Sequence, residues 1–198
     1  ALRIGVELAA DAEILAAELD AGIRAHAIIH AHDIGQSRPD VLGAIMFAYE
    51  VDGFGSALMM DDAGPPNLIA LPYLGYCLAD DPIYQNTRQF VLTSRNPYFH
   101  RGAACPAGAL GSPHVGLGWV WPLGIITQAI TATDEDEIRA CLRVLKDSSA
   151  GTGFMHEAFH HDDARRYTRD WFAWANSFFG ELILTLLDTH PGLLLAAL

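Results

Sequence analysis

The sequence has few positive charges: 12 Lys and Arg residues stand against 24 Asp and Glu residues, for a formal net charge of −12. A surface of that sign repels phosphate backbones and anionic lipid headgroups, so we expect neither nucleic acid nor a membrane as partner. No apolar run reaches the roughly 18 residues of a membrane-spanning helix. The N-terminal residues, with Arg3, Glu7 and Asp11, lack the pattern of a signal peptide. This absence favours the cytoplasm as compartment.

Cysteine is also scarce: Cys77, Cys105 and Cys141 lie far apart and form no CxxC pair. An odd, scattered set argues against a disulfide framework or a cysteine-based zinc site and indicates three ordinary thiols. What the sequence does have is apolar residues, which make up 51% of its 198 residues while 18% are charged. That composition excludes disorder for most of the chain, and the length predicts a single domain over residues 1–198.

Alternating strand patterns are missing between the turn signals, whereas helical spacing of apolar residues is frequent. We therefore expect an all-α fold. Helices are predicted over residues 2–29 with a break at 10–11, and over 68–78, 121–131, 133–146 with Thr133 as N-cap, and 169–187. Loops are predicted over residues 30–40, 49–60, 61–66, 95–118 and 148–153, which are rich in Gly, Pro and Asp.

One short string matches a known metal-binding pattern. His156-Glu157-Ala158-Phe159-His160 is an H-E-x-x-H, which on a helix binds zinc through both imidazoles and uses the glutamate as base. Here the string is enclosed by the glycines of residues 151–153 and by His161-Asp162-Asp163, which leaves little room for a long helix. A zinc hydrolase using His156, Glu157 and His160 is kept as an alternative.

Aromatic side chains lie beside carboxylates in several predicted loops, as where Phe159, Trp171 and Trp174 follow Glu157. Aromatic rings pack against the C–H faces of sugars, short acids bind hydroxyl groups, and two carboxylates can supply the acid and base of glycoside hydrolysis. Carbohydrate chemistry is therefore a second hypothesis from the residues alone.

Nine strings resemble those of glycoside hydrolase family 125 in order and spacing. They are YEVDGFG (49–55), MDDAGPP (60–66), LPYLGY (71–76), DPIYQNTRQFVL (81–92), NPYF (96–99), GSPH (111–114), WPLGIITQAITATDEDEI (121–138), AGTGFMHEAFH (150–160) and WFAWANSFFGELIL (171–184). The resemblance implies an exo-acting α-1,6-mannosidase that inverts configuration, needs no metal or cofactor, and folds as an (α/α)6 barrel. Its implied partner is a mannose-containing oligosaccharide.

The resemblance also implies roles for single residues. Glu157 matches the general base, which activates water from a carboxylate typically about 6.5–9.5 Å from the general acid. His156 and Trp174 are expected to shape the same pocket. The candidate mannose contacts are Asp52, Asp61, Asp62, Asn86, Arg88, His114 and Trp121. Structural alternatives stay open, since Asp61 and Asp62 fit turn or cap positions, Arg88 fits an internal ion pair and Glu157 fits an ordinary surface or capping acid.

Two departures from the family pattern matter. The Arg-Pro-Ser-Asp-Asp string associated with the general acid is missing, and Arg38-Pro39-Asp40 is only a superficial echo. The family's Asp-Asp-Ala-Asn is Asp61-Asp62-Ala63-Gly64 here. We therefore expect the C-terminal part of a barrel, without its N-terminal hairpins, with an exposed apolar patch and poor solubility. An inactive or mannose-binding fragment is the non-enzymatic alternative.

Overall fold

The computed structural model describes residues 2–30 and 45–196 and divides the chain into two compact units, Ala1–Met59 and Met60–Leu198. A single domain over residues 1–198 remains a prediction. The Arg38-Pro39-Asp40 echo lies outside the described residues.

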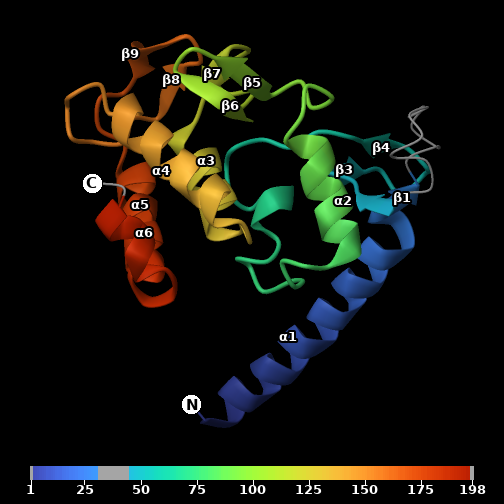
Figure 1. The fold of residues 1–198 in the computed structure, drawn as a ribbon. Helices are drawn as coiled ribbons and strands as arrows, with labels where there is room; N and C mark the ends of the chain where they lie inside the picture. Colours follow the sequence, from blue (N-terminus) through green and yellow to red (C-terminus); the bar gives the residue numbers. More distant parts are fainter. Residues whose placement is uncertain (1, 31–44, 197–198) are drawn as a thin grey trace. The chain divides into compact units, whose positions relative to one another are not determined.

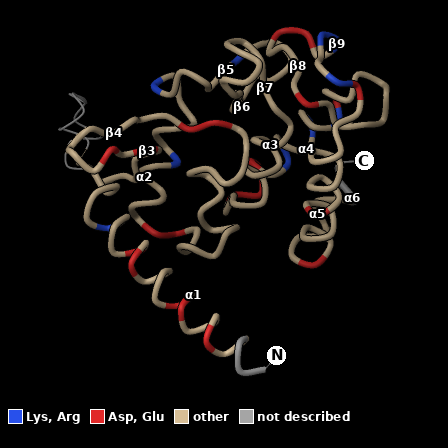
Figure 2. The backbone as a smooth tube through the Cα atoms, turned by 180° about the vertical axis from the view of Figure 1, so that it is seen from behind, with Lys and Arg blue, Asp and Glu red and all other residues tan. Residues whose placement is uncertain are grey.

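The first unit begins with a long helix, α1 (Leu2–Gly22), which continues into the π-helix η1 (Ile23–Ala27) (Figure 1). The predicted break at residues 10–11 is wrong, because the alanine-rich stretch there favours an unbroken helix. Carboxylates line α1 (Figure 2). Five large apolar side chains of α1 are more than half exposed, as expected for an apolar patch: Val6, Leu8, Ile14, Leu15 and Leu19.

Two short antiparallel pairs complete the first unit. Strand β1 (Ile28–His30) pairs with β2 (Ile45–Phe47), with Ile29 opposite Met46. Strand β3 (Glu50–Val51) pairs with β4 (Ala57–Leu58) around the glycines of the intervening turn. The loop predicted over residues 49–60 is therefore a small hairpin.

The second unit is built on helices. Its helices are η3 (Leu68–Ala70), α2 (Pro82–Val91), α3 (Pro122–Ile130), α4 (Glu135–Ser148), α5 (Ala173–Thr189) and α6 (Pro191–Ala196). Helix α3 is buried on nearly every side and packs against both α4 and α5, in agreement with its uniformly apolar sequence. The N-cap of α4 is Asp134, which accepts from the Asp136 N–H, and not the predicted Thr133.

Residues 68–78 do not form the predicted helix. Only the single 3-10 turn η3 forms, capped by the Asn67 side chain, which accepts from the N–H of Ala70. Pro72 and Gly75, whose φ of +74° is left-handed, end the helical path after one turn.

The second unit also contains strands, which the sequence interpretation missed. β5 (Phe99–Gly102) and β6 (Cys105–Leu110) form a hairpin, and β7 (Trp119–Val120), β8 (Ala158–His160) and β9 (Asp163–Thr168) form a sheet in that order. Gly108 lets β6 pass over the Phe99 ring, since a Cβ at this position would lie 2.1 Å from it. The all-α expectation is therefore correct for the dominant helices and wrong in excluding strands. All three cysteines are free thiols, as expected.

Among residues 2–30 and 45–196, no helix combines the length and apolarity needed to cross a bilayer.

Candidate active site

Glu157 lies directly before β8, beside the end of β9. Its Oε2 accepts a 3.1 Å hydrogen bond from Thr168 Oγ1 and lies 3.3 Å from Arg169 Nε. The backbones also meet, because the Glu157 N–H donates to the carbonyl of Arg169 at 3.4 Å. The carboxylate is thus fixed through one oxygen, and its side chain is only 15% exposed. Neither of these two donors engages Oε1.

Arg169 adopts a strained backbone conformation beside Glu157. Its φ of +43° is in the left-handed region, which costs of order 1–3 kcal/mol for a residue with a side chain. That geometry persists where surrounding contacts over-determine it, which is common at functional sites.

The start of α5 is docked against the segment that carries Glu157. The Asn176 side chain donates to the carbonyl of Met155 at 2.9 Å and accepts from its N–H at 3.1 Å. The Phe172 N–H donates to the same carbonyl at 3.2 Å. These three bonds join a helix and a loop about twenty residues apart in sequence, and so set where Glu157 lies.

A row of rings extends from this point. His114 lies 6.2 Å from Trp121, Trp121 meets Phe172 edge to face at 6.2 Å, and Phe172 lies 6.4 Å from Trp174. Arg169, the partner of Glu157, stacks over the Phe172 ring at 5.8 Å. The structure therefore brings together four predicted residues, Glu157, His114, Trp121 and Trp174, through two that the sequence analysis missed, Arg169 and Phe172.

Trp121 carries a polar group without a partner. Its ring is 5% exposed, and its Nε1–H finds no acceptor among the residues that the structure describes. A buried indole normally finds one.

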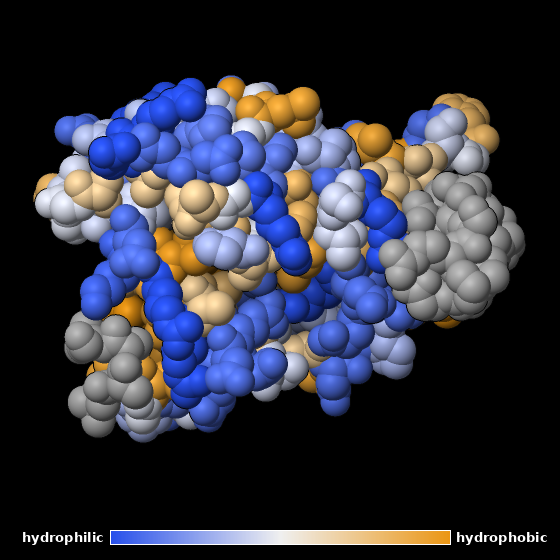
Figure 3. Space-filling view, turned by 45° about the horizontal axis from the view of Figure 1, so that its top comes forward, coloured by the Kyte–Doolittle hydropathy of each residue, from blue (hydrophilic) through white to orange (hydrophobic). Residues whose placement is uncertain are grey.

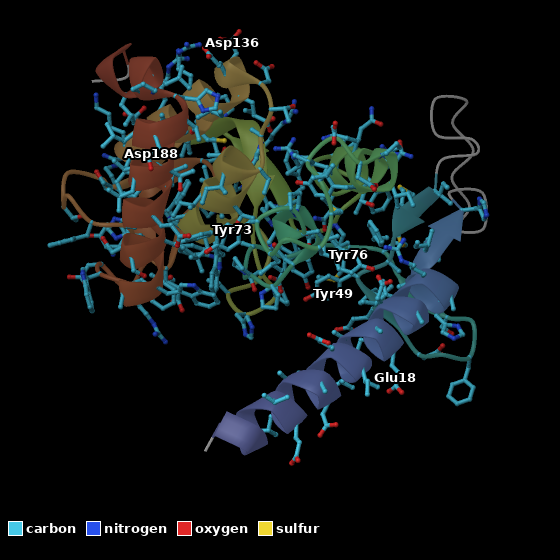
Figure 4. The ribbon with its side chains drawn as sticks, turned by 90° about the horizontal axis from the view of Figure 1, so that it is seen from below. Glu18, Tyr49, Tyr73, Tyr76, Asp136 and Asp188 are labelled. Carbon is cyan, nitrogen blue, oxygen red and sulfur yellow. The ribbon has the colours of Figure 1, made fainter. Side chains whose placement is uncertain are left out.

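A small pocket of about 190 Å³ borders Trp174 on α5. Tyr73, labelled in Figure 4, reaches α5 and donates to Glu181 Oε1 at 2.9 Å across this pocket. Partial burial and the contact with Glu181 raise the pKa of the Tyr73 phenol. The sequence analysis did not name Tyr73, although it lies within the LPYLGY string that carries the resemblance.

His156 is a buried anchor. Its Nδ1 lies 2.8 Å from the Asp170 carbonyl and its Nε2 3.2 Å from the Ser149 carbonyl, and its ring stacks on Tyr167 at 3.8 Å. The second histidine of the H-E-x-x-H string, His160, instead packs edge to face against the Trp119 ring. The string is extended, not helical, so its two imidazoles do not share a face and the zinc hydrolase interpretation has no support here.

The carboxylates of Asp61 and Asp62 accept hydrogen bonds from backbone N–H groups. Asp61 is fully buried, and its two oxygens accept from the N–H groups of Leu68 and Ile69. Burial raises the pKa of Asp61 to about 8, against the lowering effect of those two hydrogen bonds. Asp62 Oδ1 accepts from Gly64 at 2.6 Å. These contacts agree with the turn and cap alternative for both residues.

The remaining candidates have contacts of their own. Asp52, in the first unit, accepts from the N–H groups of Phe54 and Ser56, and these bonds lower the pKa of its carboxyl. Arg88 on α2 pairs with Glu137 at 3.0 Å and donates to the Gln128 carbonyl at 3.1 Å, which is the ion-pair alternative. Asn86 is half-buried on the same helix.

Comparison with known proteins places this geometry in a family. A family model described as metal-independent alpha-mannosidase (GH125) matches residues 2–184. The meiotically up-regulated gene 157 protein of Schizosaccharomyces pombe is 46% identical over 95% of this chain, which spans 35% of that protein. A solved Streptococcus pneumoniae structure, a metal-independent α-mannosidase in a non-productive complex with α-1,6-mannobiose, is 43% identical with a TM-score of 0.81. The alignment covers 90% of this chain and 39% of that structure. This chain belongs to glycoside hydrolase family 125, the metal-independent α-mannosidases.

Proposed function

We propose that this chain supplies the water-activating part of an exo-α-mannosidase that removes terminal α-1,6-linked mannose with inversion. Glu157 is the general base, and Trp121, Trp174 and His114 contact the sugar. The observation that carries the proposal is the Glu157 carboxylate itself, held by Thr168 and Arg169 next to a row of aromatic rings. The mannobiose complex of the Streptococcus pneumoniae relative supports the substrate class.

The arrangement suits a base. An inverting glycosidase needs a fixed carboxylate that takes a proton from the attacking water. Thr168 and Arg169 fix Oε2, and Oε1 is the oxygen that accepts that proton. The aromatic row then offers a flat apolar face to the sugar at Trp174, which is 46% exposed.

The general acid is proposed to come from a part of the family's chain that this sequence does not span. This chain corresponds to 35% of the curated relative's length. The helices of the second unit would then be part of an (α/α)6 barrel completed by hairpins from that other part.

The test uses the full-length protein that contains this segment. Glu157→Gln should lower kcat on α-1,6-mannobiose by about 10²–10⁴-fold while changing KM little, because the amide keeps the shape and loses the base. The matched control is Glu135→Gln, an exposed acid in the first turn of α4. Full activity of the Glu157→Gln variant would overturn the assignment.

Product stereochemistry tests the mechanism separately. Proton NMR of the fresh product should show β-mannose first, because the water attacks the face opposite the leaving group. Added azide should restore turnover to Glu157→Ala and give β-mannosyl azide. If α-mannose appeared first, the enzyme would be retaining and Glu157 would not be the base of an inverting reaction. No observation favours a mannose-binding remnant over this proposal.

A further inference from the structure

Two histidines and an aspartate meet at the turn between β8 and β9. One ligand atom from each of His160, His161 and Asp162 lies within 4.8 Å of the others. We propose that this cluster, the β8–β9 turn site, binds a divalent transition metal such as Zn²⁺ or Ni²⁺. The site is separate from Glu157, which lies at the other end of β8, and the proposal does not depend on the mannosidase activity.

Two of the three ligands are already arranged. His161 Nδ1 lies 2.7 Å from the Arg101 carbonyl, a contact that places the ring proton on Nδ1 and leaves the Nε2 lone pair for a metal. That Nε2 lies 3.5 Å from Asp162 Oδ2. Zinc bonds of about 2.0–2.1 Å in a tetrahedron put neighbouring ligand atoms roughly 3.3 Å apart. His161 and Asp162 therefore match one edge of such a site.

The Asp162 carboxylate is also oriented, by a hydrogen bond from the backbone. Its Oδ1 accepts from the Ala103 N–H at 3.2 Å, in the turn between β5 and β6. The backbone of His161 is held on both sides. The Ala104 N–H donates to the His161 carbonyl at 2.8 Å, and the His161 N–H donates to the Gly118 carbonyl at 3.0 Å. Hydrogen bonds of this kind fix ligand orientation in metal sites.

His160 is the ligand that must adjust. Its ring centroid lies 4.7 Å from that of His161, and its Nδ1 accepts a 3.2 Å bond from the Asp162 N–H. Binding requires this bond to be exchanged or the ring to turn. Space is available, because Gly118 (φ +85°) has no side chain where a Cβ would stand 3.7 Å from the Nε2 atoms of both histidines.

The charges around the site work in both directions. Arg166, stacked over Trp119 at 5.9 Å, opposes a cation, and the carboxylates of Asp162 and Asp163 offset it.

The donor set decides the class of metal. Two imidazole nitrogens and one carboxylate suit Zn²⁺, Ni²⁺ and Cu²⁺, whereas Ca²⁺ and Mg²⁺ prefer oxygen ligands throughout. Three protein ligands leave the fourth position to water. Asp162 is exposed and both histidines are half-buried, so the turn is open to ions from solvent. The face of the molecule in Figure 3 carries hydrophilic groups with apolar patches among them.

The test is calorimetric titration of the untagged full-length protein that contains this segment with ZnSO₄, in a buffer that does not chelate. We expect one equivalent to bind, and Co²⁺ in its place to give the visible absorption of a tetrahedral site. Asp162→Asn and His161→Asn should each weaken binding at least tenfold. Asn at position 161 can still donate toward Arg101, which preserves the turn. His26→Ala, an exposed histidine in the first unit, is the control and should bind as the wild type does.

The proposal is overturned if the wild-type chain binds no Zn²⁺, or if His161→Asn and Asp162→Asn bind it as tightly as the wild type. Binding of Mg²⁺ or Ca²⁺ with equal affinity would also overturn it, because it would indicate a non-specific acidic surface. Circular dichroism of each variant confirms that its fold is intact.

Discussion

Replacing Asp61 by Asn should change how the stability of this chain depends on pH. Burial raises the pKa of the Asp61 carboxyl in the folded chain to about 8, from its ordinary value of 3.8. Between these two values the folded state holds a proton that the unfolded state has released. Stability in this window therefore falls as pH rises, and the contribution is fully lost above the folded pKa.

The magnitude follows from the shift. One pKa unit corresponds to about 1.4 kcal/mol. Raising the pH from about 5 to 8 should therefore lower the contribution of Asp61 to the free energy of unfolding by roughly 3–4 kcal/mol. Asn at this position does not titrate. It keeps the oxygen facing Leu68 and loses the acceptor facing Ile69, which costs about 1–3 kcal/mol at every pH. The variant is therefore less stable than the wild type at pH 5 and matches or exceeds it at pH 8.

Urea unfolding of the wild type and of Asp61→Asn at several pH values measures the difference in their free energies of unfolding. The other titrating groups are the same in both proteins, so their effects cancel in this difference. If the difference in free energy of unfolding between the two proteins stayed constant from pH 5 to pH 8, the reasoning would be refuted. It would mean that the two backbone N–H groups keep Asp61 ionised against the effect of burial. Raised KM for mannobiose with unchanged stability would instead restore Asp61 as a sugar contact.

Three further changes test other contacts. Arg169→Ala should lower kcat of the full-length protein about tenfold with little change in KM, because Glu157 loses its partner; an equal rise in KM would indicate a binding role. Phe159→Ala should lower the free energy of unfolding by about 3–5 kcal/mol in urea titration, since the ring is fully buried. Arg88→Ala should lower it by about 1–3 kcal/mol and leave KM unchanged, whereas a raised KM would favour a mannose contact.

The sequence predicted the helices of the second unit better than its strands. Helix α3 is apolar throughout, α4 has acids in its first turn and Lys146 in its last, and α5 is a long, largely apolar segment, so their positions could be predicted to within a few residues. Strand β7 has two residues and β8 has three, which is too short for alternation to be visible. The longer β6 contains Pro and Gly, which read as loop residues.

Some residues of the candidate site could be predicted from the sequence and others could not. Glu157, His114, Trp121 and Trp174 were named from strings shared with a family, and the structure brings them to one place. Arg169 was missed because its role depends on a left-handed backbone and on pairing with a residue twelve positions earlier. Neither feature leaves a mark in a residue pattern.

Aspartates and glutamates in this chain differ in what their carboxylate oxygens contact. Both oxygens of Asp61 are used by backbone N–H groups, and Asp52 caps its own turn. Glu157 is held by side chains through a single oxygen and is partly open. A capping acid needs only a nearby turn, which local sequence specifies, whereas a base must keep one oxygen for water while remaining fixed by the other. That distinction depends on tertiary contacts between β8, β9 and α5, so it separates Glu157 from the capping acids Asp61 and Asp52 only in the folded chain.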